Sequence, residues 1–229
     1  MSLRLSTVIL PHRRWHEGGR ASWRRAEELG FHTAYTYDHL SWRSFRDGPW
    51  FGAMPTLTAA AGVTERMRLG TLVTSPNFRH PVTLAKELIS LDDISGGRVT
   101  LGIGAGGTGF DATVLGQEPW TPRERADRFA EFVPLADRLL TEESVSYEGD
   151  FYSAHGARSI PGCVRRPRLP FAGRSRGWPT RVPRSAVTRP VSTRSSSPVS
   201  PRTVAVRWSR WRRSWTSRAA TQSWASPTS

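Results

Sequence analysis

The stretch Arg98-Val-Thr-Leu-Gly-Ile-Gly-Ala-Gly-Gly107 decides how the rest of the sequence is interpreted. It predicts a short strand over residues 98–101 that runs into four glycines within six positions. Glycine has no Cβ and tolerates positive φ, so backbone N–H groups can approach a ligand closely there. We therefore expect a ligand site where this strand ends.

The glycines admit three interpretations. Gly102, Gly104 and Gly107 match the dinucleotide fingerprint G-x-G-x-x-G, which works only where a helix begins at once and receives the pyrophosphate. Residues 108–120 hold two further glycines and a proline and show no helical period, which argues against the fingerprint. A glycine-rich turn without a ligand and a barrel-type ligand site are the other two interpretations.

Strands and helices alternate along the chain around this stretch. The strands are predicted at 3–10, 33–37, 69–74 and 98–101. The helices are predicted at 17–29, 54–65 and 121–140, and a further helix is predicted to begin at residue 81. A hairpin at 145–153 and a fifth strand at 168–172 follow. Short apolar strands that alternate with helices indicate an α/β fold with a parallel sheet and helices outside it. Ligands in such folds gather at the carboxyl ends of the strands, where Asp38-His39 and Thr74-Ser75-Pro76-Asn77 also lie.

The composition changes abruptly after Gly173. Residues 174–229 contain 12 Arg, no acidic residue, and no Leu, Ile, Phe, Tyr or Met. Residues 1–173 carry 21 basic and all 19 acidic residues, a net charge of +2, so 12 of the 14 net positive charges lie in the tail. We predict a partial barrel over 1–173 and a disordered, low-complexity basic tail over 174–229, because such a tail lacks aliphatic residues to offset its ordering entropy.

Two hypotheses address this tail. Its arginines alternate with Trp208, Trp211 and Trp215 and could bind single-stranded nucleic acid or anionic lipid, which would make the chain a basic nucleic-acid-binding protein. The other hypothesis, that the tail comes from a frameshifted or truncated gene, fits better. Arg, Ser, Pro, Thr and Trp are the residues that GC-rich codons give when read out of frame, and the barrel pattern breaks off at the fifth strand. A typical barrel needs roughly 250 residues, so we expect a truncated barrel that folds poorly and binds cofactor weakly.

Cysteine use and hydropathy predict a soluble, cytoplasmic protein. The single cysteine, Cys163, allows no disulfide within the chain, and no apolar run is long enough for a signal peptide or a membrane span. The sequence has no metal-ligand spacing, nucleophile elbow or P-loop, so no metal is expected.

The run LGTLVTSPNFRHPVTLAKELISLDDISGGRVTLGIGAGG (69–107), with TYDHLSW (36–42) upstream, resembles the luciferase-like flavin and deazaflavin oxidoreductases. The resemblance is greatest to the branch that depends on the deazaflavin coenzyme F420, and it extends from residue 3 to about 172. It implies a (β/α)8 TIM barrel, here truncated to about its first half, that transfers a hydride between coenzyme F420 and a small-molecule substrate. A monooxygenase that uses reduced FMN and molecular oxygen is the close alternative, and a complete barrel could form a homodimer.

The resemblance also implies where a cofactor would lie. Leu72 and Val73 match a position where the family often has a non-proline cis peptide against the ring, and Gly104, Ala105 and Gly106 match the backbone beneath it. Thr74 is a further candidate for hydrogen bonding to the cofactor.

Asp38 and His39 match the pair beside the ring, and Trp42 matches an aromatic side chain on the substrate side. His39 is the predicted proton donor or acceptor, because imidazole titrates near neutral pH, and Asp38 would orient it or bind the ring. A histidine that only holds a loop, next to an aspartate that starts the turn, is the alternative. Some family members that oxidise sugar phosphates have a glutamate where Gly107 stands, so the resemblance does not imply that chemistry here.

Overall fold

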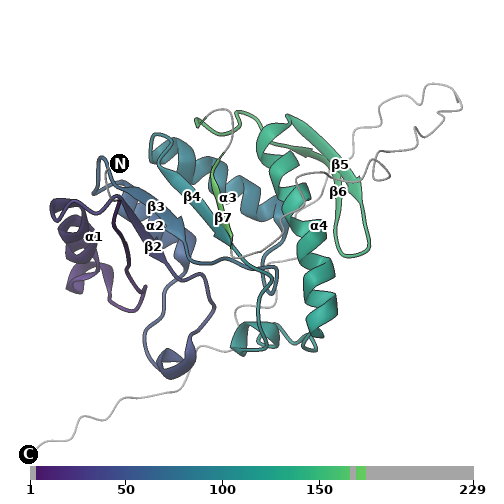
Figure 1. The fold of residues 1–229 in the computed structure, drawn as a ribbon, viewed down its shortest axis with the longest axis horizontal. Helices are drawn as coiled ribbons and strands as arrows, with labels where there is room; N and C mark the ends of the chain where they lie inside the picture. Colours follow the sequence, from purple (N-terminus) through teal and green to yellow (C-terminus); the bar gives the residue numbers. More distant parts are fainter. Residues whose placement is uncertain (1–3, 166–168, 174–229) are drawn as a thin grey trace, which may run out of the picture. The chain divides into compact units, whose positions relative to one another are not determined.

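Five short strands run parallel in one sheet, as the alternation of strands and helices predicts (Figure 1). In sheet order they are β1 (Ser6–Val8), β2 (Thr33–Thr36), β3 (Arg68–Thr71), β4 (Val99–Ile103) and β7 (Phe171–Gly173). The computed structural model describes residues 4–165 and 169–173. The predicted basic tail therefore lies outside the described residues.

Four α-helices lie close to their predicted positions: α1 (Gly19–Glu28), α2 (Ala53–Ala61), α3 (Pro81–Ile94) and α4 (Pro122–Thr141). Helix α4 begins with a capping box, in which Thr121 N donates to the Glu124 carboxylate (2.8 Å) and Glu124 N donates to Thr121 Oγ1 (3.3 Å). The predicted hairpin is longer than 145–153, with antiparallel strands β5 (Ser144–Glu148) and β6 (Ser153–Arg158). Three short 3-10 turns complete the connections: η1 (Trp15–Glu17), η2 (Arg43–Phe45) and η3 (Phe110–Ala112).

The two faces of the sheet differ in character. Ala34, Leu69 and Leu101 are completely buried in the core cluster that the helices cover, and in Figure 1 α2 and α3 lie behind the strands. The opposite face is more polar: Arg68 donates to Thr100 Oγ1 (3.0 Å) and to Val99 O (2.9 Å). The sheet is thus apolar on the face that the helices cover and more polar on the other face.

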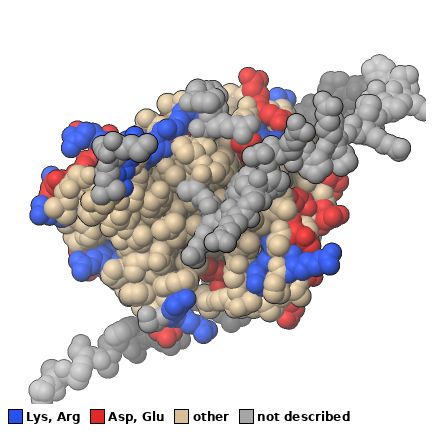
Figure 2. Space-filling model, viewed as in Figure 1, with Lys and Arg blue, Asp and Glu red and all other residues tan. Residues whose placement is uncertain are grey.

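Figure 2 shows acidic and basic side chains around the edge of one face of the molecule, with a broad uncharged area between them. None of the helices within residues 4–165 has the length and apolar character that crossing a membrane requires.

Strands β3 and β4 approach so closely that both need glycine. A Cβ on Gly70 would lie 2.3 Å from Thr100 O, and a Cβ on Gly102 would lie 1.9 Å from Thr71 O. Both positions are fixed: Gly70 pairs with Thr100 in the ladder that joins the strands, and the Thr71 hydroxyl donates to Gly102 O (2.7 Å). The glycine in the middle of β4 therefore serves strand packing, in addition to any role toward a ligand.

Beyond Thr71 the chain leaves β3 and then returns to β4. Leu72 N still donates to Thr36 O of β2 (2.8 Å), whereas Thr74 N donates to Gly102 O (2.8 Å) and Thr74 O accepts from Gly104 N (2.9 Å). Leu72 and Val73 form no ladder with β4, and this is how they come to face the space beyond the sheet.

Glu27, at the end of α1, fixes the start of β3. Its carboxylate accepts hydrogen bonds from the backbone N–H groups of Glu65 (3.0 Å), Arg66 (2.7 Å) and Met67 (2.8 Å). Burial alone would raise the pKa of Glu27, but these three donors outweigh burial and lower it below 4.5.

Replacing Gly102 by alanine should destabilise the fold by about 3 kcal/mol, because the new methyl group meets a backbone carbonyl that cannot move away. Gly109→Ala is the matched control, since a Cβ there would have no atom within 4 Å. Urea unfolding of both variants measures the difference. Equal midpoints for G102A and G109A would contradict the close approach of β3 and β4.

Glu27→Gln should lower the free energy of unfolding at pH 7 by about 1–2 kcal/mol, a value discounted for partial exposure. Because the pKa is depressed in the folded state, this stabilisation is present above 4.5 and is lost as the pH falls through the lower, folded pKa. Unfolding curves at pH 7 and pH 3 test this, with the exposed Glu28→Gln as control. If E27Q lowered the free energy of unfolding as much at pH 3 as at pH 7, the stabilising role of the ionised Glu27 carboxylate would be contradicted.

Candidate active site

A cavity of about 830 Å³ lies at the carboxyl ends of β2, β3 and β4. Its size is within the range of small-molecule and cofactor sites. Most of the predicted site residues line it: His39, Trp42, Leu72, Val73, Gly104, Ala105 and Gly106. The sequence placed these residues on three separate strand ends, and the parallel sheet brings them together.

Leu72 and Val73 form one wall of this cavity. The peptide bond between them is cis, as the family resemblance implies. Val73 Cγ2 lies 3.1 Å from the position of a Cβ on Gly104, so a side chain on Gly104 would press on Val73. Glycine at position 104 therefore makes room for the Val73 side chain in the cavity wall.

Gly106 is required for two reasons. Its φ is +80°, a conformation that favours glycine, and a Cβ would lie 2.4 Å from Asn77 Oδ1. The Asn77 amide instead packs over the glycine, and its Nδ2 donates to Gly107 O (3.0 Å). No α-helix begins at Gly107; the next one begins at Pro122, which rules out the dinucleotide fingerprint.

His39 is held in one orientation by Asp111. Its Nδ1 faces the Asp111 carboxylate in a short hydrogen bond, and the other carboxylate oxygen accepts from Leu40 N (2.8 Å). The ring of Trp42 lies 4.4 Å from the imidazole, centroid to centroid. This arrangement leaves Nε2 of His39 as the nitrogen available for proton transfer.

Asp111 was not among the predicted site residues. It is almost completely buried and lines the cavity, but it lies 72 positions from His39, in a loop with several other polar residues. The only sequence signal was its position just after the glycine cluster, which does not specify a partner.

Asp38 and Thr74 do not line the cavity. The Asp38 carboxylate is buried, accepts two hydrogen bonds from Arg79 (2.8 and 3.1 Å), and accepts a third from the Thr74 hydroxyl. Arg79 also pairs with Glu87 (2.8 Å). Burial alone would lower the pKa of Arg79, but Asp38 and Glu87 outweigh it and raise the pKa, so this is an ion pair. Arg79 thus draws Asp38 behind the cavity wall.

Two buried polar atoms at the cavity have no hydrogen-bond partner among the described residues: Ser41 Oγ and Asn77 Oδ1. Buried polar groups are nearly always paired in folded proteins. A ligand with polar edges would supply the missing partners. Within the same described ranges, no group of His, Cys, Asp and Glu side chains is arranged to hold a metal ion.

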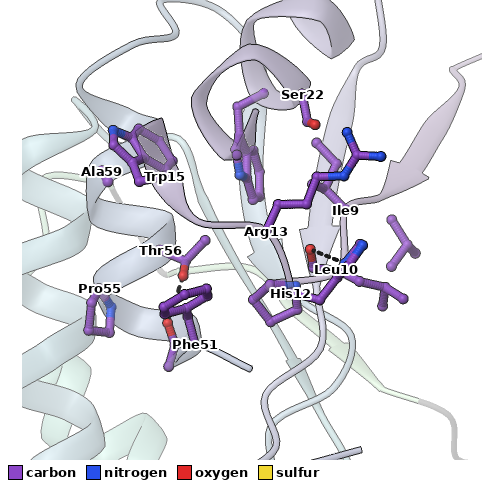
Figure 3. A pocket seen from close by; sticks show the side chains of 15 residues that line it. Ile9, Leu10, His12, Arg13, Trp15, Ser22, Phe51, Pro55, Thr56 and Ala59 are labelled. Carbon is purple, nitrogen blue, oxygen red and sulfur yellow. Dashed lines mark hydrogen bonds between the residues drawn. The ribbon is translucent and has the colours of Figure 1, made fainter. Parts of the chain in front are cut away.

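A second cavity, of about 580 Å³, lies between α1, α2 and the segment after β1 (Figure 3). Its walls are mostly apolar, and Trp15, Phe51 and Pro55 line it. Two of its polar groups are paired with backbone oxygens: Thr56 Oγ1 donates to Gly52 O (2.8 Å), and His12 Nδ1 lies 3.2 Å from Leu10 O. It offers little for chemistry, and the cavity at His39 is therefore the candidate site.

Comparison with known proteins agrees with this geometry. The sequence model of the luciferase-like monooxygenase family matches residues 14–200. This chain belongs to that family. The fold is therefore that of a luciferase-like TIM barrel, and the described strands form part of the barrel wall.

Two curated relatives and one solved structure illustrate the membership. The F420-dependent glucose-6-phosphate dehydrogenase of Intrasporangium calvum is 42% identical over 137 residues, which cover 58% of this chain and 41% of the relative. The 4-hydroxyprotoasukamycin monooxygenase of Streptomyces nodosus subsp. asukaensis is 34% identical over 161 residues, which cover 69% of this chain and 41% of the relative. The monooxygenase RslO1 from Streptomyces bottropensis has a TM-score of 0.65 and 29% identity, covering 75% of this chain and 53% of that one. The chain thus spans about two fifths of the length of these curated relatives.

Asp38→Asn should destabilise the fold by about 3 kcal/mol, because it leaves the guanidinium of Arg79 buried without its main counter-charge. The exposed Asp47→Asn is the matched control and should have little effect. Denaturant unfolding of both variants gives the measurement. An unchanged midpoint for D38N would show that the Asp38–Arg79 pair does not support this end of the sheet.

Proposed function

We propose that this chain is a luciferase-like oxidoreductase that transfers a hydride between coenzyme F420 and a small organic substrate. One observation carries the proposal: the exposed wall at Leu72–Val73 and the bare backbone at Gly104–Gly106 face one cavity beside an imidazole of fixed orientation. The F420-dependent dehydrogenase relative, at 42% identity over 137 residues, supports the choice of cofactor.

The residues present fit such a ring. Leu72 and Val73 would contact its face, next to the backbone of residues 104–106, which lines the same cavity. The unpaired Ser41 Oγ and Asn77 Oδ1 would meet its polar edges. When bound, the deazaflavin supplies the hydride acceptor or donor, and the protein supplies orientation.

His39 would hold or accept the proton that accompanies hydride transfer, at Nε2, because Nδ1 is bonded to Asp111. Asp111 is then a positioning residue, and Trp42, against the imidazole, covers the substrate side. Asp38 and Thr74 act indirectly: with Arg79 they brace the strand ends that carry His39 and Val73. A reducing, cytoplasmic location is part of the proposal and is supported by the single cysteine, Cys163.

A monooxygenase that uses reduced FMN is the second candidate. It is supported by the monooxygenase relative at 34% identity and by the similarity to RslO1. Both candidates need the same wall and the same histidine, so cofactor preference separates them. The residue at position 107 is glycine, where some sugar-phosphate-oxidising members of the family have a glutamate, so the substrate proposed is a small organic molecule without further specification.

Titration of the 229-residue chain with coenzyme F420 and, separately, with FMN tests the proposal by fluorescence quenching. We expect saturable quenching of F420 at lower protein concentration than that of FMN, even if binding is weak. Gly104→Val should weaken F420 binding at least about tenfold, because its side chain enters the space beside Val73. Gly62→Ala, at the end of α2, should leave binding unchanged.

Circular dichroism of the G104V variant establishes that it is folded. Preferential binding of FMN would favour the monooxygenase. F420 quenching that G104V and G62A affect equally would overturn the proposed ring site.

A further inference from the structure

The charges at the mouth of the active-site cavity are unbalanced. Arg43 and Arg46 both line it, and in the part of the chain that the structure describes neither guanidinium forms an ion pair with a carboxylate. Asp111 is the one carboxylate among the lining residues, and it is engaged by His39 and by Leu40 N. The mouth therefore carries two positive charges without internal compensation.

Aromatic rings hold both guanidinium groups in place. The Arg43 guanidinium carbon lies 4.8 Å above the Trp42 ring, and that of Arg46 lies 4.8 Å above the Phe110 ring. A guanidinium stacked by its face keeps its N–H edge free for a bidentate contact with an oxyanion. Such stacking also reduces the entropy lost when an anion binds.

The backbone supports this placement. Arg43 has a φ of +42°, the one positive value for a non-glycine residue among the described residues. Residues held in that region cluster at ligand sites, because the surroundings must enforce the conformation. Ser41, two positions earlier, is buried at the same cavity with an unpaired Oγ, so a polar ligand group, of the ring or of the substrate, fits beside Arg43.

We infer that Arg43 and Arg46 bind an anionic group of the substrate, a phosphate ester or a carboxylate, and so select charged over neutral substrates. The inference rests on the proposed function for the identity of the cavity, and it adds the substrate class. The Arg43 guanidinium and the His39 imidazole both contact the Trp42 ring, at 4.8 and 4.4 Å from its centroid, so the anionic group would lie near the imidazole proposed for proton transfer. Two stacked arginines match the charge of a phosphate monoester better than that of a single carboxylate.

The test uses the 15N-labelled 229-residue chain and follows the indole N–H signal of Trp42, assigned by its loss in Trp42→Phe. The probes are glucose 6-phosphate, gluconate and glucose, which carry a phosphate, a carboxylate and no charge. Dependence of the shift on Arg43 and Arg46 distinguishes this site from anion binding by the arginines of 174–229. We expect saturable shifts with the two anions, larger affinity for the phosphate, and no shift with glucose.

Arg43→Gln with Arg46→Gln should weaken anion binding about tenfold or more, and added NaCl should weaken it in the parent chain. The exposed Arg24→Gln, on α1 and outside this cavity, is the matched control and should bind as the parent does. Equal binding of glucose and glucose 6-phosphate, or unchanged binding by the double variant, would overturn the inference.

F420 quenching, measured on the same variants, separates this inference from the proposed function. If the parent chain fails to quench F420 while Trp42 still reports arginine-dependent anion binding, the proposed cofactor is wrong and the anion site stands. If the double variant loses F420 binding but keeps glucose 6-phosphate binding, the arginines serve an anionic part of the cofactor, and the inference fails.

Discussion

The close approach of β3 to β4 is the constraint on which the site depends. It is possible only because residues 70 and 102 lack a Cβ, which would meet the backbone carbonyls of Thr100 and Thr71. With the strands this close, Thr74 can return to β4 while Leu72 and Val73 stay outside the ladder. The same steric demand therefore packs the barrel wall and exposes the two residues against which a planar ring can lie.

Neighbouring residues at the end of β2 show how far sequence reasoning reaches. The strand end itself, the capped helices and the glycine turn were predictable, because each depends on residues a few positions apart. The partners were not: Asp38 pairs with Arg79, 41 positions on, and His39 with Asp111, 72 positions on. Local pattern carries no information about which of several acidic or basic residues will meet across a fold. Of the predicted pair, His39 lines the cavity and Asp38 does not, and the role of each in binding or catalysis stays a prediction.

The side chains of Asp38 and His39 point in opposite directions, one toward a structural ion pair and the other toward the cavity. Asp38 points behind the cavity wall, where Arg79 and Thr74 compensate its charge and join β2 to the segment after β3. His39 points to the cavity, where Asp111 fixes the ring. One strand end thereby braces the wall and presents the imidazole, and the burial of the Asp38–Arg79 pair keeps a second carboxylate away from His39.

Two loops meet over this wall, and their contacts determine the substrate side of the cavity. Asp111 binds His39 and Leu40 N, Arg46 stacks on Phe110, and Trp50 Nε1 donates to His39 O (2.8 Å). The loop after β2 and the loop after β4 thus position one another through a few polar and aromatic contacts, whereas the ring wall depends on backbone packing. Since loops tolerate substitution far better than a glycine contact between strands, the ring wall is the more constrained part of the site and the loops are where substrate choice can change. Arg43 and Arg46 lie in the part that is free to change.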